Sequence, residues 1–434
     1  MRSNNSQQLA GSIHQTTPRL RPATKSQPRL KILWLVCVDY RLETAHGGNL
    51  RLFNYGREFV SQGHDVYFVV MKRKTDSDDE RKRCLNELKR QKIITDFFEI
   101  DYQRPRLGGK VGHLLFYPAL TNLSLRKSQA PVVDTIQEII ARKQIDICIF
   151  SARDLLFVLP RIKEEVKTIV DWADSYFLYH VREARLNLKT LRPDRALHSL
   201  RLMADAFIEE RYYGRQCVSN LTVSPVDKRY LDFANRAPHK NHILLNGVAA
   251  GRANGISKIK GRLIFTGNMD FPPNYQSAIW FIDHVFPLLQ DHRDIHLVIA
   301  GANPVKELVA RTSERIEVTG YKAELRNEIA RSELYVAPLI CGGGFKNKVV
   351  EAIASGTYLV GTSMAVEFLG PKARQHLLIA DSPRQMADAI LTYLQGRQEF
   401  AANLEALKRI VDQEFTWEGK AREFVEIISG AQAS

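Results

Sequence analysis

The chain has 434 residues, of which 44% are hydrophobic and 25% are charged. These proportions are typical of a globular protein and exclude a disordered or membrane-spanning chain. At this length two domains are the default expectation, because a single core rarely grows beyond about 300 residues. The formal net charge of +14 leaves three classes of anionic partner open, namely nucleic acid, a membrane surface and a small ligand.

The chain begins with a basic segment and a short apolar run. Residues 1–29 carry five Arg or Lys residues and no acidic residue, which predicts a disordered basic tail. The run KILWLVCV (31–38) is far shorter than the roughly 20 apolar residues of a spanning helix, and no small-residue cleavage site follows it. It therefore predicts a buried strand. The five cysteines are scattered without a CxxC pair, which favours a reducing cytoplasm.

Apolar runs alternate with amphipathic stretches from residue 30 onward, which predicts parallel sheets covered by helices on both faces. A first series of strands is expected at 31–38, 64–71, 145–150, 167–172 and 220–224. A second series is expected at 262–267, 295–301, 315–320, 333–339 and 357–362, with helices at 273–289, 304–312, 323–331 and 346–355. The predicted fold is α/β, with two Rossmann-like doubly wound domains that face each other across a cleft.

The expected boundaries follow from these two series. The N-terminal domain spans 30–245 and the C-terminal domain spans 246–410. The remaining residues, 411–434, are expected to form a helix that packs back toward the N-terminal domain.

The stretch CGGGFKNKVVEAIASG (341–356) lies between a predicted strand and a predicted helix. Glycines at 342–344 let main-chain N–H groups approach an anion, and a helix N-terminus adds partial positive charge. Lys346 and Lys348 supply cations for a diphosphate, and Glu351 can accept hydrogen bonds from a ribose or sugar diol. The plain alternative is a glycine turn with two solvated lysines and a surface glutamate.

The segment 337–370, APLICGGGFKNKVVEAIASGTYLVGTSMAVEFLG, resembles the donor-site signature of the GT-B glycosyltransferases of family 4. It is especially similar to the bacterial exosortase-associated sugar transferases of exopolysaccharide clusters. Three further segments agree with this resemblance, namely 46–69, 244–248 (LLNGV) and 265–289, which opens with FTGNMDFPPN.

The resemblance implies a nucleotide-diphosphate sugar donor held mainly by the C-terminal domain, while the N-terminal domain takes the acceptor. Lys346 would then contact the diphosphate and Glu351 the nucleotide ribose. The other donor-pocket residues implied by the resemblance are Gly267 and Asn268 on one side, and Gly47 and Gly48 on the other.

One position departs from the family pattern. The broader family carries a second glutamate eight residues before the position of Glu351, where it contacts the donor sugar. Here that position is Gly343. Retention of anomeric configuration is thus implied by the resemblance alone.

Three further side chains are candidates for catalysis. Asp171 and Asp174 lie at the end of a predicted strand, where a carboxylate could orient the acceptor hydroxyl or act as a base. Alternatively, Asp174 caps the helix that follows. His46, directly before the glycine pair 47–48, could touch the donor or the acceptor.

No metal and no cofactor are expected. The run DSDDE (76–80) contains an Asp-x-Asp pair, but it lies in a charged stretch and not at a strand end. Two lysines and a helix N-terminus can neutralise a leaving diphosphate without a metal ion.

The segment 104–127 interleaves basic and aromatic residues and could lie on an anionic bilayer near a lipid-linked acceptor. An amphipathic helix packed on its own domain explains it equally well. Nucleic-acid binding is not expected, because no zinc-finger or RNA-binding signature accompanies the charge.

The function predicted from these features is glycosyl transfer onto a hydroxyl of a glycan or polyprenyl-linked acceptor, in polysaccharide synthesis at the cytoplasmic face of the membrane. Two alternatives stay open. A sugar-nucleotide 2-epimerase of the same fold needs no second substrate. A non-catalytic basic protein that associates with membrane or nucleic acid needs no donor.

Overall fold

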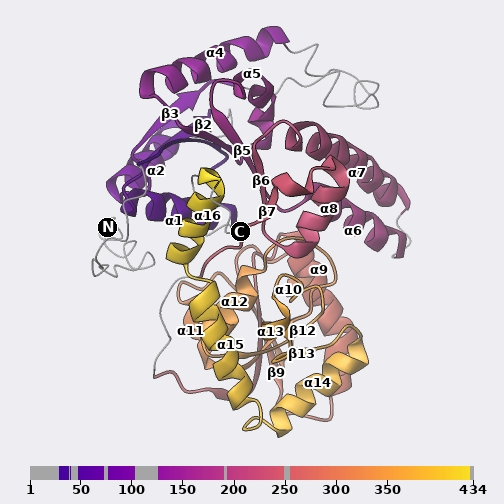
Figure 1. Cartoon of the computed structure of the whole chain (residues 1–434). Helices are drawn as coiled ribbons and strands as arrows, with labels where there is room; N and C mark the ends of the chain where they lie inside the picture. The colour runs from indigo at the N-terminus through magenta and orange to yellow at the C-terminus, as the bar shows by residue number, and fades with distance from the viewer. Residues whose placement is uncertain are drawn as a thin grey trace, which may run out of the picture.

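The computed structural model describes residues 29–38, 40, 47–72, 77–102, 126–189, 193–248 and 255–430. Two parallel sheets with helices on their faces form two domains, which lie one above the other in Figure 1. This arrangement confirms the predicted fold class. The basic tail, His46, most of the segment 104–127 and the first residue of the run 76–80 lie outside the described residues.

The N-terminal sheet has seven strands in the order β3-β2-β1-β4-β5-β6-β7. Their bounds are β1 (Lys31–Val36), β2 (Asp65–Met71), β3 (Asp96–Ile100), β4 (Ile147–Phe150), β5 (Lys167–Ala173), β6 (Ser219–Thr222) and β7 (Asn241–Ile243). The central strands are apolar runs buried along their length, and all seven residues of β2 are buried. The sequence analysis missed β3 and β7, which are edge strands of mixed polarity.

Seven α-helices accompany this sheet in the described part of the chain: α1 (Gly47–Ser61), α2 (Asp78–Arg90), α4 (Arg126–Lys143), α5 (Leu159–Ile162), α6 (Tyr176–Lys189), α7 (Pro193–Gly214) and α8 (Pro225–Asn235). Local chemistry sets several of their ends. Ser224, for example, accepts a hydrogen bond from the Asp227 N–H, and Pro225 occupies the first turn of α8. Helices α6 and α7 form a hairpin that projects from the side of the domain (Figure 1).

The C-terminal sheet has six strands in the order β10-β9-β8-β11-β12-β13. Their bounds are β8 (Ile259–Thr266), β9 (His296–Ala300), β10 (Ile316–Gly320), β11 (Ser332–Ala337), β12 (Tyr358–Gly361) and β13 (Leu378–Ile379). The helices are α9 (Pro272–Trp280), α10 (Lys306–Val309), α11 (Leu325–Arg331), α12 (Asn347–Ala354), α13 (Pro371–Arg374), α14 (Pro383–Gln395), α15 (Ala401–Glu414) and α16 (Trp417–Ser429). The helix expected at 273–289 is α9 followed by a π-helical turn and a 3-10 turn.

The last helix leaves the C-terminal domain and completes the N-terminal core. Phe424 of α16 is fully buried, with ring centroids 5.3 Å from Tyr55 and 5.1 Å from Phe59. Figure 1 shows α16 beside α1. Helix α15 remains on the C-terminal core, so the chain crosses between domains after residue 414 and not at residue 411.

The two crossings between the domains lie side by side. The Val248 N–H donates to the Phe415 carbonyl at 2.7 Å, and Val248 forms a parallel bridge with Thr416. The domains are therefore joined by two neighbouring segments of the chain and not by one flexible linker.

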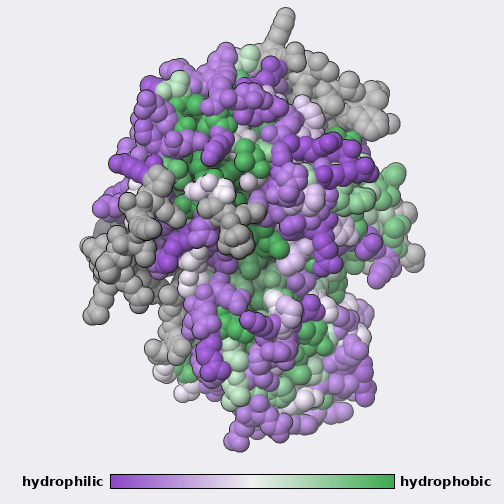
Figure 2. Space-filling model, viewed as in Figure 1, coloured by the Kyte–Doolittle hydropathy of each residue, from purple (hydrophilic) through white to green (hydrophobic). Residues whose placement is uncertain are grey.

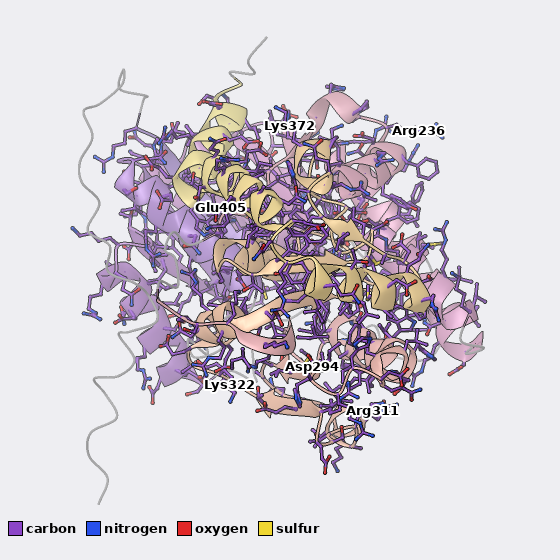
Figure 3. The ribbon with its side chains drawn as sticks, turned by 90° about the horizontal axis from the view of Figure 1, so that it is seen from below. Arg236, Asp294, Arg311, Lys322, Lys372 and Glu405 are labelled. Atoms are coloured by element: carbon purple, nitrogen blue, oxygen red, sulfur yellow. The ribbon has the colours of Figure 1, made fainter. Side chains whose placement is uncertain are left out.

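The surface in Figure 2 is mainly hydrophilic, with hydrophobic residues gathered in separate areas. Seen from below, Asp294, Arg311 and Lys322 point outward from the C-terminal domain (Figure 3). Within the described ranges, no helix has both the length and the apolar composition that a membrane span requires.

Candidate active site at the domain junction

A buried ion pair fixes the N-terminal side of the junction. Arg51 of α1 donates to both carboxylate oxygens of Asp171 on β5, each at 2.9 Å. Burial opposes the charge of Arg51, but the neighbouring Asp171 carboxylate raises its pKa overall. Because both oxygens of Asp171 accept hydrogen bonds from the guanidinium and its side chain is buried, this carboxylate holds α1 in position.

Arg51 also links the N-terminal domain to the C-terminal one. Its remaining nitrogen donates to Asn246 Oδ1 at 2.7 Å, and the Asn246 amide donates to Asn347 Oδ1 at 3.1 Å. Asn347 is the first residue of α12. The first turn of α1 faces open space at Gly48, where a Cβ atom would meet no other atom within 4 Å. Gly47 begins the same helix, so the two predicted glycines share its first turn.

Asp174 follows β5 and keeps a solvent-exposed face although protein surrounds it. Desolvation and the neighbouring Asp227 carboxylate raise the pKa of Asp174. The Ser175 hydroxyl, and not Asp174, caps α6, because it accepts from the Leu178 N–H at 3.1 Å. Asp174 is thus left available to a ligand.

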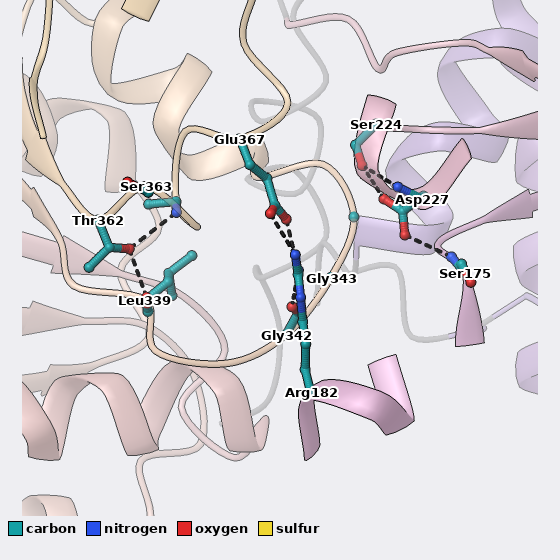
Figure 4. Close-up of polar contacts among 12 residues, drawn as sticks. Ser175, Arg182, Ser224, Asp227, Leu339, Gly342, Gly343, Thr362, Ser363 and Glu367 are labelled. Carbon is teal, nitrogen blue, oxygen red and sulfur yellow. Dashed lines mark hydrogen bonds and ion pairs between the residues drawn. The ribbon is translucent and has the colours of Figure 1, made fainter. Parts of the chain in front are cut away.

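Asp227 holds the backbone beside Asp174 in place. It is fully buried, accepts from the Ser175 N–H at 2.8 Å and is hydrogen-bonded to the Ser224 hydroxyl (Figure 4). Burial raises the pKa of Asp227, and these hydrogen bonds oppose the shift. Sequence reasoning missed this residue, because a carboxylate in the first turn of a helix is an ordinary feature.

The glycine loop of the C-terminal domain comes into direct contact with these carboxylates. Gly342 and Gly344 have φ angles of +101° and +72°, which L side chains rarely adopt. A Cβ atom on Gly344 would fall 1.7 Å from Asp174 Oδ1, whereas one on Gly343 would have Asp227 Oδ1 as its nearest neighbour, at 3.7 Å. The loop therefore needs glycine at 344 for both its conformation and its contact.

Lys346 is enclosed at this contact. Its ammonium donates to the carbonyls of Gly343 and Gly344, the second at 2.7 Å, and lies 3.8 Å from Glu367 Oε1. Burial lowers the pKa of Lys346, and the carboxylates of Glu367, Asp174 and Asp227 oppose that shift. The charge of Lys346 is thus committed to the loop and to the domain junction.

Lys348 points to a different place. Its ammonium donates to Asn274 Oδ1 at 2.5 Å, and a Cβ atom on Gly267 would fall 2.8 Å from it. Burial, together with the charge of Lys346, lowers the pKa of Lys348 to about 7. Gly267 and Lys348 therefore meet at the carboxyl end of β8.

Two other predicted donor residues lie close to this point. Asn268 follows Gly267, and its carbonyl accepts from the Asn274 amide at 2.9 Å. Glu351 lies one turn after Lys348 on α12, and burial raises the pKa of its carboxyl group. The structure thus gathers Gly267, Asn268, Lys348 and Glu351 in the C-terminal domain. Asn274 was not singled out from the sequence, although it belongs to the quoted FTGNMDFPPN segment.

An ion pair between the two domains holds the glycine loop in place. Arg182 of α6 donates to the Gly342 carbonyl at 2.6 Å and to both oxygens of Glu367, at 2.8 and 2.6 Å (Figure 4). Both side chains are mostly buried. Neither residue was identified from the sequence, because each lies in a different domain and the pairing appears only in the folded chain.

In the part of the chain that the structure describes, no group of three or more His, Cys, Asp or Glu side chains is arranged to hold a metal ion. Asp78 of the run 76–80 belongs to the first turn of α2, where it pairs with Arg81 at 2.5 Å.

Comparison with known proteins places this site in a known fold. Residues 260–396, most of the C-terminal domain, match the family described as glycosyl transferases group 1. An uncharacterised 44.6 kDa protein in the cps region of Klebsiella pneumoniae is 27% identical over 155 residues. That match spans 32% of this chain and 40% of the Klebsiella protein.

Solved structures resemble the whole chain at low sequence identity. HepE of Anabaena in complex with UDP superposes with a TM-score of 0.64 at 16% identity, over 92% of this chain and 100% of that one. A glycosyltransferase from Rickettsia africae gives 0.63 at 16% identity, over 94% and 100%. The chain therefore has the two-domain GT-B fold of glycosyltransferases, with a group 1 domain at its C-terminal side.

We predict that Gly344→Ala destabilises the protein by about 1–3 kcal/mol, because alanine is strained at this φ angle and its Cβ meets Asp174. Gly343→Ala is the matched control, since its Cβ has room, and we expect a change below about 0.5 kcal/mol. Equilibrium urea unfolding measures both. Equal losses for the two variants would contradict the loop geometry.

We also predict that Arg182→Ala loosens the contact between the domains, because it leaves Glu367 and the Gly342 carbonyl without their partner. Small-angle X-ray scattering is expected to show a larger radius of gyration than for the wild type. Arg185→Ala, an exposed arginine on the same helix, is the control. Identical scattering curves for the two variants would show that the ion pair does not hold the domains together.

Proposed function

We propose that this protein is a glycosyltransferase that moves a sugar from a nucleotide-diphosphate sugar to a hydroxyl of a glycan or polyprenyl-linked acceptor. One observation carries the proposal. Gly267, Lys348 and Glu351 meet at the carboxyl edge of a parallel sheet, within the domain that matches group 1 glycosyl transferases. Ligands of open α/β sheets bind at such an edge.

Each of these residues has a role in binding the donor. Lys348 offers an ammonium to the diphosphate, beside the N-terminus of α12. Glu351 accepts hydrogen bonds from the ribose, and Gly267 with Asn268 lines the pocket. Lys346 acts indirectly, because its contacts hold the glycine loop in position. The UDP bound by HepE supports a uridine nucleotide as the carrier.

Asp174 is the candidate for the acceptor side. It is accessible, it touches the glycine loop and its pKa is raised, so it can accept a proton near neutral pH. In the transfer, the bond between the anomeric carbon and the diphosphate oxygen breaks and a bond to the acceptor oxygen forms. The acceptor proton passes to Asp174 or to the leaving diphosphate.

Stabilisation of the departing diphosphate is the main catalytic task in this proposal. Lys348 and the N-terminus of α12 supply it from the C-terminal domain. Gly47 and Gly48, in the first turn of α1, approach from the N-terminal domain, with His46 directly before them.

The resemblance to family 4 supports retention of anomeric configuration and a place in exopolysaccharide synthesis. The related protein in the Klebsiella cps region supports polysaccharide synthesis as well. The reaction would then take place at the cytoplasmic face of the membrane, where polyprenyl-linked acceptors are available.

The test is thermal unfolding with UDP-, GDP-, ADP- and CMP-sugars, followed by product analysis with a polyprenyl-linked acceptor. One nucleotide class is expected to raise the unfolding midpoint, since a ligand at about 100 times its Kd adds roughly 2.7 kcal/mol. Lys348→Met is expected to lose this shift, because it removes the cation for the diphosphate. The exposed Lys372→Met is the control and is expected to keep it.

Product analysis separates the candidate activities. Transfer releases free nucleotide in proportion to glycosylated acceptor. A 2-epimerase would interconvert sugar nucleotides with no acceptor present. If no sugar nucleotide shifts the wild-type midpoint, the proposed donor site is wrong.

Donor affinity is also expected to depend on pH. The pKa of Lys348 is about 7 and a bound diphosphate raises it, so above pH 7 binding requires proton uptake and the Kd rises with pH. Below pH 7 Lys348 is already protonated, so it adds no pH dependence to the Kd of the donor. Calorimetric titrations at pH 8 in two buffers of different ionisation enthalpy measure the uptake.

Asp174 also has a raised pKa and becomes more negative over the same range, so the Lys348→Met variant is needed as a reference. The part of the proton uptake that belongs to Lys348 disappears in that variant. An affinity that stays constant between pH 7 and pH 9 would refute the assignment of Lys348.

A further inference from the structure

The α6–α7 hairpin exposes large apolar side chains at its outer end. Leu188 near the end of α6 is 57% exposed, and Leu197 and Leu200 near the start of α7 are 70% and 40% exposed. Figure 2 shows hydrophobic residues over this projecting part of the N-terminal domain, at the right of the view. Three leucines together on a protruding element are costly in water unless a partner covers them.

The apolar surface continues along the hairpin toward α8. Phe207 lies seven residues after Leu200 and therefore on the same face of α7. Its ring centroid is 6.0 Å from that of Phe233, which is 64% exposed. The exposed apolar residues thus form a stripe and not isolated positions.

Basic side chains surround this stripe. The exposed residues Arg185, Lys189, Arg195 and Arg201 lie on the same two helix ends. Within residues 185–189 and 194–201, Asp194 is the single acidic residue. The outer face of the C-terminal domain differs, since there Arg311 pairs with Asp283 at 2.8 Å.

We propose that the outer end of the α6–α7 hairpin binds the surface of an anionic lipid bilayer. Leucines enter the boundary between headgroups and acyl chains, while arginines and lysine contact anionic headgroups. A second copy of this chain is a poorer partner, because a symmetric contact would bring two basic surfaces together.

Docking in this way would fix the distance of the site from the bilayer. Helix α6 begins two residues after Asp174 and ends at Lys189, so its 14 residues span about 21 Å at 1.5 Å per residue. Arg182 lies midway along it. This inference concerns lipid binding alone and does not require the proposed glycosyl transfer.

The test is sedimentation of the full chain with vesicles of phosphatidylcholine, with and without phosphatidylglycerol. Wild type is expected to sediment with vesicles that contain phosphatidylglycerol and not with vesicles of phosphatidylcholine only. The fraction of protein that sediments is expected to fall at high salt. Two double variants are each expected to weaken vesicle binding by about tenfold or more. One combines Leu197→Ser with Leu200→Ser, and the other combines Arg195→Gln with Arg201→Gln.

The controls are matched substitutions of exposed residues in the C-terminal domain. Leu288→Ser with Val309→Ser tests exposed apolar residues, and Lys306→Gln with Lys372→Gln tests exposed charges. Both pairs are expected to bind like wild type. Circular dichroism of every variant checks that it is folded.

Three results would overturn the proposal. Wild type could fail to bind anionic vesicles. The hairpin variants could bind as well as wild type, which would assign binding to another basic segment such as the N-terminal tail. Wild type could form a dimer that the leucine variants abolish without any change in vesicle binding, which would make a second copy the partner. Because no sugar nucleotide is present, none of these results depends on the catalytic proposal.

Discussion

Charges of opposite sign meet at the junction of the two domains, and the position of the glycine loop depends on their mutual neutralisation. Lys346 lies among loop carbonyls and carboxylates, while Arg182 joins the loop to Glu367. A buried charge without partners is very costly, so each of these groups requires the others. As a result, the loop that carries the donor-site residues is shaped by side chains from the opposite domain.

The two lysines at the start of α12 divide this work. Lys346 is the N-cap residue, and its φ and ψ angles of −100° and 79° are not helical, whereas Lys348 belongs to the first turn. The Lys346 ammonium contacts the loop carbonyls and lies near Glu367, whereas the Lys348 ammonium contacts Asn274 beside Gly267. One short segment thus supplies a structural cation to the junction and a separate cation to the donor pocket. Spacing alone would not distinguish their roles without knowledge of where the helix begins.

Local patterns predicted the strands well where burial is continuous, as in β2, and failed for β3 and β7, where edge strands of mixed polarity carry no strong pattern. The same distinction applies to the site. The glycines, lysines and Glu351 form one local sequence motif and could be predicted. Arg182 and Glu367 are 185 residues apart, and the contact of Asp174 with Gly344 also joins two domains. Such pairs arise from domain packing, which no local pattern encodes.

The position of α16 has a consequence for the order in which the protein matures. Phe424 fills the N-terminal core against Trp34, Tyr55 and Phe59, although it follows the whole C-terminal domain in the chain. The N-terminal domain would normally fold first on the ribosome, as early domains do. Here its aromatic core lacks one wall until the C-terminal domain has also emerged. Completion of both domains is therefore a single late event, and nascent chains that stop short of α16 leave an aromatic surface open to chaperones.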